Sequence, residues 1–113
     1  MTAVAPVADI VIPVFNEGKQ IRGVLDSLKV ITEPVRVLIC YDFDEDDTLS
    51  ALRGYDPAPL QLQLVRNHSR GALEAVRAGF AASSAPLVIT FPADDNYNAP
   101  RLDRMIALGK QGY

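Results

Sequence analysis

The hydrophobic residues of this chain form four short apolar segments, separated by segments in which apolar residues recur at helical spacing. The apolar segments have the length and β-branched composition of strands, and they cover residues 9–14, 35–41, 61–65 and 87–91. Helices are expected over residues 16–30, 48–52 and 72–83, and from residue 100 onward. Because strands that alternate with helices are typical of a parallel sheet, the pattern predicts an α/β fold with an open, mostly parallel sheet and flanking helices.

Local signals predict where the helices begin and which faces they bury. Asn16 is expected to cap the first helix, and Pro100 occupies the favoured first turn of the last one. The expected inward side chains are Ile21, Val24, Leu25 and Leu28 in the first helix, Leu73, Val76 and Phe80 in the third, and Leu102, Met105 and Ile106 in the last.

The predicted strands differ in their polar character. Residues 87–91 are mostly apolar and bounded by prolines, which favours a strand buried inside the sheet. Residues 61–65 alternate polar and apolar side chains, as a half-exposed strand near an edge would. Residues 1–8 are small and apolar without a period, and they are expected to form a loose leader.

Composition limits the chain to a single domain over residues 1–113, since 113 residues with 49% hydrophobic content support one core. The 11 basic and 14 acidic residues give a net charge of −3, which argues against a nucleic-acid partner. Cys40 is the only cysteine and lies in an apolar segment, so it is expected to be a buried structural thiol. Neither a membrane span nor a signal peptide is visible, and the expected location is the cytoplasm.

Acidic residues follow two of the predicted strands. Because parallel strands end at one edge of a sheet, the two acidic loops are expected to meet there: Asp42, Asp44, Glu45, Asp46 and Asp47 on one, and Asp94 and Asp95 on the other. Such crowding favours a hard divalent cation, Mg²⁺ or Mn²⁺, held by one or two carboxylates. The alternative is a solvated loop whose acids cap the helix at Thr48, and this is expected for Glu45 and Asp46.

Residues 67–71 form a loop before the third helix. Ser69 is available there as a cap, and Arg70 can reach an anionic ligand. No Gly-Lys-Ser follows, so this is not a Walker loop, and His68 is expected to be an exposed loop residue. One histidine and one buried cysteine leave no basis for a Ser-His-Asp or Cys-His arrangement, and no catalytic residue is identified.

Four short motifs together resemble the family 2 glycosyltransferases. Ile-Pro-Val-Phe-Asn-Glu at residues 12–17 is similar to the family's IPxYNE opening, and residues 40–48 align without gaps on its VDDGSxDGT loop. Residues 67–79 match the spacing N-xxx-G-xxx-A-xxx-G, and Phe-Pro-Ala-Asp-Asp at residues 91–95 occupies the place of the DAD motif. The order and spacing agree from Asp9 to Tyr113.

The resemblance implies a GT-A-type, Rossmann-like domain that binds a nucleoside-diphosphate sugar, in an inverting, metal-assisted glycosyltransferase. The residues implied to bind the nucleotide are Pro13, Phe15, Asn16, Glu17, Asp42, Asp44, Arg70, Gly71 and Ala93. Asp94 and Asp95 would hold Mg²⁺ or Mn²⁺, which stabilises negative charge on the departing diphosphate as a Lewis acid. The sequences Arg70-Gly71-Ala72 and Ala78-Gly79-Phe80 are similar to variants with polyprenyl-phosphate acceptors, such as dolichol-phosphate mannose synthase.

Three departures from the family pattern shape the expectation. Tyr41 and Pro92 stand where the family has aspartates, and the loss of the second removes a potential metal ligand. The third departure is length, because the family continues beyond the Gly-Tyr at residues 112–113 into an acceptor site and a catalytic base.

The chain is therefore expected to be the N-terminal, donor-binding part of a longer transferase, and it is not expected to transfer sugar on its own. The alternative location of the longer protein is the cytoplasmic face of a membrane. An open sheet of this size is expected to self-associate as a dimer.

Other functions remain open at the level of sequence. A sugar-phosphate nucleotidyltransferase has a related fold, but the Gly-rich basic loop it usually carries is not visible at residues 13–19. A non-catalytic α/β interaction module that has lost its metal site is favoured by Tyr41 and Pro92. A flavodoxin-like receiver domain also has acids at strand ends, but its usual lysine beyond a later strand is not visible.

Overall fold

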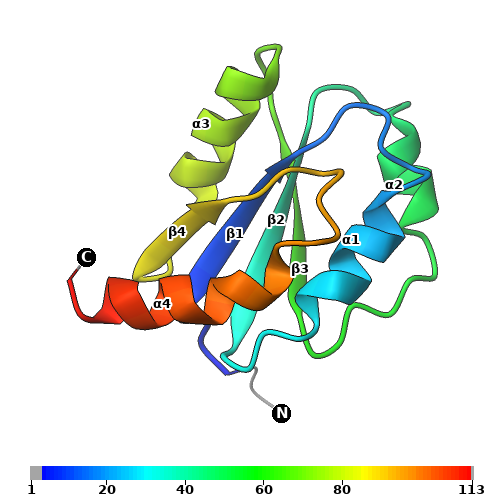
Figure 1. Cartoon of the computed structure of the whole chain (residues 1–113). Helices are drawn as coiled ribbons and strands as arrows, with labels where there is room; N and C mark the ends of the chain where they lie inside the picture. The colour runs from blue at the N-terminus through cyan, green and yellow to red at the C-terminus, as the bar shows by residue number, and fades with distance from the viewer. Residues whose placement is uncertain (1–3, 113) are drawn as a thin grey trace.

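Four parallel strands in the order β3-β2-β1-β4 form the central sheet (Figure 1). The computed structural model describes residues 4–112. The strands are β1 (Ala8–Pro13), β2 (Val35–Tyr41), β3 (Gln61–Arg66) and β4 (Leu87–Thr90). The helices are α1 (Ile21–Leu28), α2 (Asp47–Ala51), α3 (Ala72–Ala82) and α4 (Leu102–Lys110), with a 3-10 turn η1 (Ala99–Arg101) before the last. The predicted α/β fold is confirmed.

The two central strands, β1 and β2, are the most buried ones. Ala8 in β1 lies opposite Val35 in β2 on one side and Leu87 in β4 on the other, so β1 is paired along both edges. The alternating strand β3 lies at one edge, as predicted. The prediction of a buried fourth strand was wrong, because β4 lies at the other edge and alternates half-buried with exposed residues.

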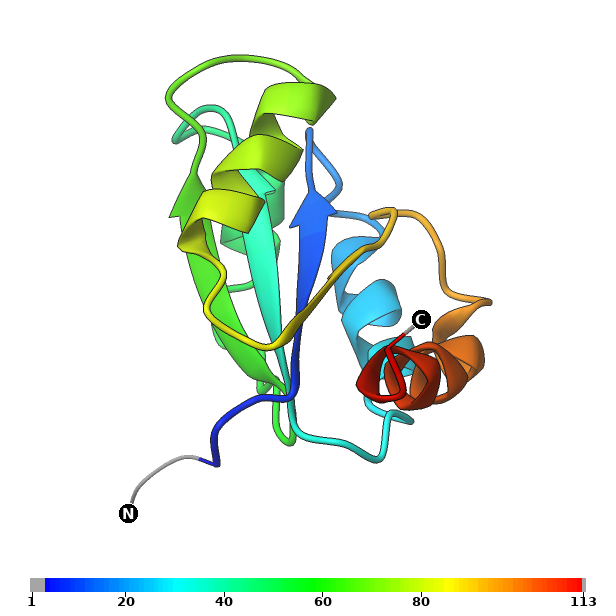
Figure 2. The same ribbon diagram turned by 90° about the vertical axis from the view of Figure 1, so that its left-hand side faces the viewer.

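Helix α3 covers one face of the sheet, and α1 and α4 cover the other (Figure 2). On the α3 side, Ala75 packs against Val11, Leu38 and Cys40. Gly79 lies so close to β1 that an added Cβ would be 2.5 Å from Val11 Cγ1. Small residues thus let this helix approach the sheet closely.

The predicted inward face of α3 was wrong. Leu73 and Phe80 are 65% and 51% exposed, and Val76 is only partly buried. The face that packs on the sheet carries Ala75 and Gly79 instead, because large side chains would hold the helix away from β1.

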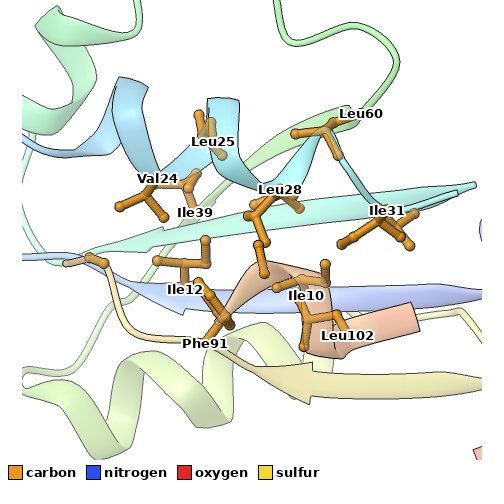
Figure 3. Close-up of a cluster of buried hydrophobic side chains, with 14 of the residues drawn as sticks. Ile10, Ile12, Val24, Leu25, Leu28, Ile31, Ile39, Leu60, Phe91 and Leu102 are labelled. Carbon is orange, nitrogen blue, oxygen red and sulfur yellow. The ribbon is translucent and has the colours of Figure 1, made fainter. Parts of the chain in front are cut away.

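The larger core lies on the opposite face of the sheet (Figure 3). Ile10 and Ile12 of β1 and Ile39 of β2 meet Leu25 and Leu28 of α1 there. Leu102 and Ile106 of α4 are buried as predicted. Met105 is 49% exposed, so its predicted inward position was wrong. Within the part of the chain that is described, no helix is long and apolar enough to cross a membrane.

A buried carboxylate, Asp9, forms an ion pair between β1 and β2 and also binds the segment before β4. Arg36 donates two hydrogen bonds to the Asp9 carboxylate, at 2.9 and 3.0 Å, and the Ser83 hydroxyl and the Ser84 and Ala85 N–H groups also donate to Asp9 Oδ2. Burial by itself would raise the pKa of Asp9, but these donors outweigh it and lower the pKa to about 2. The pair explains the charged residue in the otherwise apolar strand β2.

The first helix begins later than predicted. It starts at Ile21, and the position before it, Gln20, makes no side-chain cap hydrogen bond. Asn16 therefore does not cap this helix, and its side-chain oxygen accepts the N–H of Asp47 instead. At the N-terminus Ala8 already belongs to β1, and residues 1–3 of the predicted leader lie outside the described residues.

Candidate functional site

The loop after β1 is tied by hydrogen bonds to the start of α2. The Asn16 N–H donates to the Asp46 carboxylate, at 3.2 and 3.1 Å from its two oxygens. The Asn16 Oδ1 in turn accepts the Asp47 N–H at 3.1 Å, and the Glu17 N–H donates to Thr48 Oγ1 at 2.9 Å. These bonds hold the first two strand-end loops together.

Asn16 has a backbone φ of 50°, in the left-handed region. Asparagine tolerates this conformation better than most residues, because its short polar side chain can bond locally. Here that side chain binds the neighbouring loop, so the residue shapes the first loop instead of capping α1.

Asp42 lies at the junction of the second and third strand-end loops. Its Oδ1 accepts the Asn67 side-chain N–H at 2.7 Å, and its Oδ2 accepts the Gly71 backbone N–H at 3.0 Å. Asn67 is buried, with 3% of its surface exposed, and was not singled out as a site residue from the sequence. Two signals were available: its position directly after a strand, and its place as the first residue of the N-xxx-G-xxx-A-xxx-G match.

Two adjoining cavities share Phe15 and Asp42 in their walls. The first has a volume of about 310 Å³ and is lined by Pro13, Val14, Phe15, Glu17, Asp42, Gly71, Ala72 and Ala75. The second has a volume of about 490 Å³ and is lined by Phe15, Asp42, Phe43, Arg66, His68, Ser69 and Arg70. Both volumes lie in the range of small-molecule sites. We name them the apolar cavity and the basic cavity.

The basic cavity combines aromatic rings with cationic side chains. Phe15 and Phe43 form an edge-to-face pair with ring centroids 5.6 Å apart, and Phe15 remains 65% exposed. Arg66 forms an ion pair with Asp44 and lies over the Tyr41 ring, 5.6 Å from its centroid. Such a wall offers a flat apolar surface beside hydrogen-bond donors, which suits a planar polar ligand.

Most acids of the second loop have protein partners. Asp46 is only 2% exposed, so the expectation that it is solvated was wrong. Its carboxylate accepts the Thr48 N–H at the start of α2, so its expected capping role is confirmed. Asp47 accepts the Gly18 N–H at 2.8 Å, and Glu45 is exposed. Backbone N–H groups thus relieve much of the crowding that favoured a cation. Among residues 4–112, no group of three or more histidine, cysteine or acidic side chains is arranged to hold a metal ion.

The loop after β4 carries the second acidic pair, and it lies outside the walls of the two cavities. Asp95 accepts hydrogen bonds from the N–H groups of Tyr97 and Asn98 and from the Asn98 side chain. The Asn98 bonds, followed by that from Tyr97, lower the pKa of Asp95. Asp94 is exposed, and Ala93 is buried in the larger core with 7% of its surface exposed. The Phe91 N–H bonds to Val11 O at 2.9 Å, which fixes the start of this loop beside β1.

Comparison with known proteins identifies related sequences. The sequence model described as Glycosyl transferase family 2 matches residues 9–113. The chain is 27% identical over 121 residues to the undecaprenyl-phosphate 4-deoxy-4-formamido-L-arabinose transferase of Serratia proteamaculans, covering 100% of this chain and 37% of that protein. The transferase of the same name from Yersinia pestis (strain Pestoides F) is 27% identical over 110 residues, which cover 92% of this chain and 34% of that protein.

A solved structure shares the fold. Glucosyl-3-phosphoglycerate synthase from Mycobacterium tuberculosis, solved with Mn²⁺, uridine diphosphate and glucosyl-3-phosphoglycerate, superposes with a TM-score of 0.72 at 19% identity. The superposition covers 91% of this chain and 39% of that one. The chain thus spans between 34% and 39% of the length of these three proteins.

Proposed function

The chain belongs to glycosyl transferase family 2, and on that basis we propose that it binds the nucleoside-diphosphate part of a sugar donor in the two cavities around Asp42. The observation that carries the proposal is the position of Asp42, whose carboxylate lines both cavities and has both oxygens fixed by hydrogen bonds. A carboxylate held in this way can accept N–H or O–H donors of a base or ribose. Phe15, Glu17 and Gly71 line the same walls.

The remaining nucleotide residues of the proposal have different roles. Asn16 and Asp44 act through the loops, because their side chains bond to Asp47 and to Arg66. Arg70 and Pro13 belong to the walls of the basic and the apolar cavity respectively. Ala93 is buried, so its contribution would come from the backbone of its loop.

The loop after β4 has donor atoms that fit one divalent cation. Mg²⁺ and Mn²⁺ in such sites need one or two carboxylates, with phosphate oxygens and water completing the shell. The Asp94 carboxylate is exposed and accepts no hydrogen bond from residues 4–112, so Asp94 is the main proposed ligand. Asp95 Oδ2 accepts one hydrogen bond and retains a lone pair, which makes it the second. When bound, the cation would supply Lewis-acid stabilisation of the diphosphate.

The donor-binding role is proposed for residues 1–113 as the N-terminal part of a longer, inverting glycosyltransferase. The two bacterial transferases named above carry undecaprenyl phosphate in their names. On that basis, the proposed acceptor of the longer protein is a polyprenyl phosphate, and the proposed location is the cytoplasmic face of a membrane. The 113-residue chain is not expected to transfer sugar by itself.

Self-association is a separate part of the proposal. Helix α3 exposes Leu73 and Phe80, and β4 exposes Val88 at an edge of the sheet to which no other strand of residues 4–112 pairs. Apolar groups of this size at an open edge favour pairing between copies. Sedimentation equilibrium at increasing concentration is expected to show a dimer, and a monomer at millimolar concentration would contradict this expectation.

Calorimetric titration tests the proposed function directly. The chain is titrated with uridine diphosphate and with guanosine diphosphate, with and without Mn²⁺, as wild type, Asp42→Ala, Asp94→Ala and the exposed-acid control Glu45→Ala. One of the two nucleotides is expected to bind. Asp42→Ala should weaken its affinity by about 10-fold, which corresponds to the loss of one charged hydrogen bond. Asp94→Ala should remove the dependence of the affinity on Mn²⁺. Glu45→Ala should bind as the wild type does. Absence of binding under every condition would refute the proposal and favour the α/β interaction module.

A further inference from the structure

The Asn67 side chain uses its donor and its acceptor on different loops. Its Nδ2 donates to Asp42 Oδ1 at 2.7 Å, and its Oδ1 accepts the Ser69 N–H at 3.1 Å. Its own backbone N–H donates to Tyr41 O at 2.7 Å. With 3% of its surface exposed, the residue cannot exchange these partners for water without opening the loop. The amide therefore has one defined orientation, with the nitrogen toward Asp42.

We infer that Asn67 is a positioning residue that fixes the direction of the Asp42 carboxylate between the two cavities. The inference rests on the proposed function, in which Asp42 contacts the nucleotide. An ionised carboxylate has about four acceptor sites, and Asn67 and Gly71 occupy one on each oxygen. The other acceptor site on each oxygen is left for a ligand. Pre-orientation of this kind removes an ordering cost that binding would otherwise carry.

The charges around Asp42 explain why such a restraint matters. Arg66, His68 and Arg70 line the basic cavity, and Glu17 lines the apolar one. Without the Asn67 donor, Gly71 alone would hold the carboxylate among the bonds described. A rotated carboxylate could then pair with a cationic side chain, and its lone pairs would no longer be available to a ligand.

The hydrogen bond that Asn67 Oδ1 accepts from the Ser69 N–H is a separate function of the same side chain. Substitutions distinguish this bond from the bond to Asp42. Asn67→Asp is isosteric and keeps the acceptor for the Ser69 N–H, but it replaces the donor to Asp42 with a second carboxylate. Two carboxylates at hydrogen-bond distance share a proton at low pH and repel each other when both are ionised. Asn67→Ala removes both contacts.

The test measures the affinity for uridine diphosphate with Mn²⁺, or for guanosine diphosphate if that is the nucleotide bound, at about pH 5 and about pH 8. At the lower pH, the affinity of Asn67→Asp for the nucleotide is expected to lie within about 3-fold of the wild-type affinity at that pH. At the higher pH, it is expected to be at least about 10-fold weaker than wild type. The wild-type reference removes the effects of pH that the two chains share. Gln63→Glu, an added charge at an exposed position of β3, should match wild type at both values. An equal loss for Asn67→Asp at both pH values would overturn the inference.

A second readout does not depend on the nucleotide. The Gly71 N–H bonds to Asp42 and makes no side-chain contact with Asn67 among the hydrogen bonds described. If Asn67 fixes Asp42, Asn67→Asp at about pH 8, which keeps the acceptor for the Ser69 N–H, should speed hydrogen exchange of the Gly71 amide by at least about 10-fold relative to wild type at that pH. Unchanged exchange would overturn the inference; faster exchange in a chain that binds neither nucleotide would support it while refuting the proposed function. Should the aspartate variant fail to fold at the higher pH, Asn67→Ala replaces it, and exchange of the Ser69 amide, measured alongside that of Gly71, accounts for the loss of the second contact.

Discussion

The Asp46 carboxylate accepts the backbone N–H of Asn16 at 3.1 Å, although the two residues are 30 positions apart in the sequence. The same carboxylate caps α2 through the Thr48 N–H at 2.8 Å. One buried acid thus serves both the start of a helix and the shape of the loop after β1. The wall of the apolar cavity depends on this loop, which contributes Phe15 and Glu17.

Replacing Asp46 is expected to destabilise the protein and to weaken nucleotide binding together. Asp46→Ala removes a helix cap and leaves two N–H groups without a partner, which should lower the free energy of unfolding by about 2–3 kcal/mol. Urea unfolding measures this loss. Glu45→Ala, at the exposed neighbouring position, should stay within about 0.5 kcal/mol of wild type. Equal stability of the two variants would show that Asp46 does not hold the loops.

Asp9 gives the folded protein a defined sensitivity to acid. Its pKa in the folded protein is about 2, below the ordinary 3.8, so folding favours the ionised form. The resulting stabilisation, about 2 kcal/mol, is fully present above about pH 4 and is lost as the pH falls through about 2.

Asp9→Asn tests this account of acid sensitivity. The variant should be less stable at pH 7, because Arg36 loses its buried charged partner, and it should lose less further stability between about pH 4 and about pH 2 than wild type does. Urea unfolding across that range measures the difference, with the exposed Glu45→Gln as the control. If the free energy of unfolding of Asp9→Asn falls with pH as steeply as that of wild type, the proposed role of this carboxylate is contradicted.

Two glycines in helices, Gly79 in α3 and Gly23 in α1, should respond oppositely to alanine. A Cβ on Gly79 would lie 2.5 Å from Val11 Cγ1 and 2.9 Å from Cys40 Sγ, whereas one on Gly23 meets nothing within 4 Å. Gly79→Ala is therefore expected to cost about 1–3 kcal/mol through overpacking. Gly23→Ala should stabilise α1 by about 0.5–1 kcal/mol through its higher helix propensity. Thermal unfolding of both variants makes the comparison, and stabilisation of both would mean that α3 can shift at no cost.

Cys40 is expected to be unreactive in the folded protein. Its thiol is fully buried between the sheet and α3, and burial raises its pKa to about 11, so little thiolate exists at neutral pH. Ellman's reagent at about pH 8 should label the chain only after unfolding in urea. Because it is the only cysteine, complete labelling gives one thiol per chain. Rapid labelling without urea would contradict the packing of α3.

Several residues of the site were predicted from short sequence motifs. The resemblance to the family 2 glycosyltransferases implied that Phe15, Glu17, Asp42 and Gly71 bind the nucleotide, and all four line the apolar cavity. Asn67 begins one of these motifs, but nothing in the sequence shows that it is buried or that it bonds to Asp42. A polar residue's partners depend on which loops lie side by side, and this information is not local.

The sequence by itself determined the order of strands and helices, because the period of apolar residues is a property of each segment. Only the tertiary structure decided that Ala75 and Gly79, not Leu73 and Phe80, face the sheet. It also decided that β4 lies at an edge and that Asp46 is buried. These outcomes depend on how closely elements pack and on which donors lie within about 3 Å of which acceptors. Both are set by the assembled chain and not by any one segment.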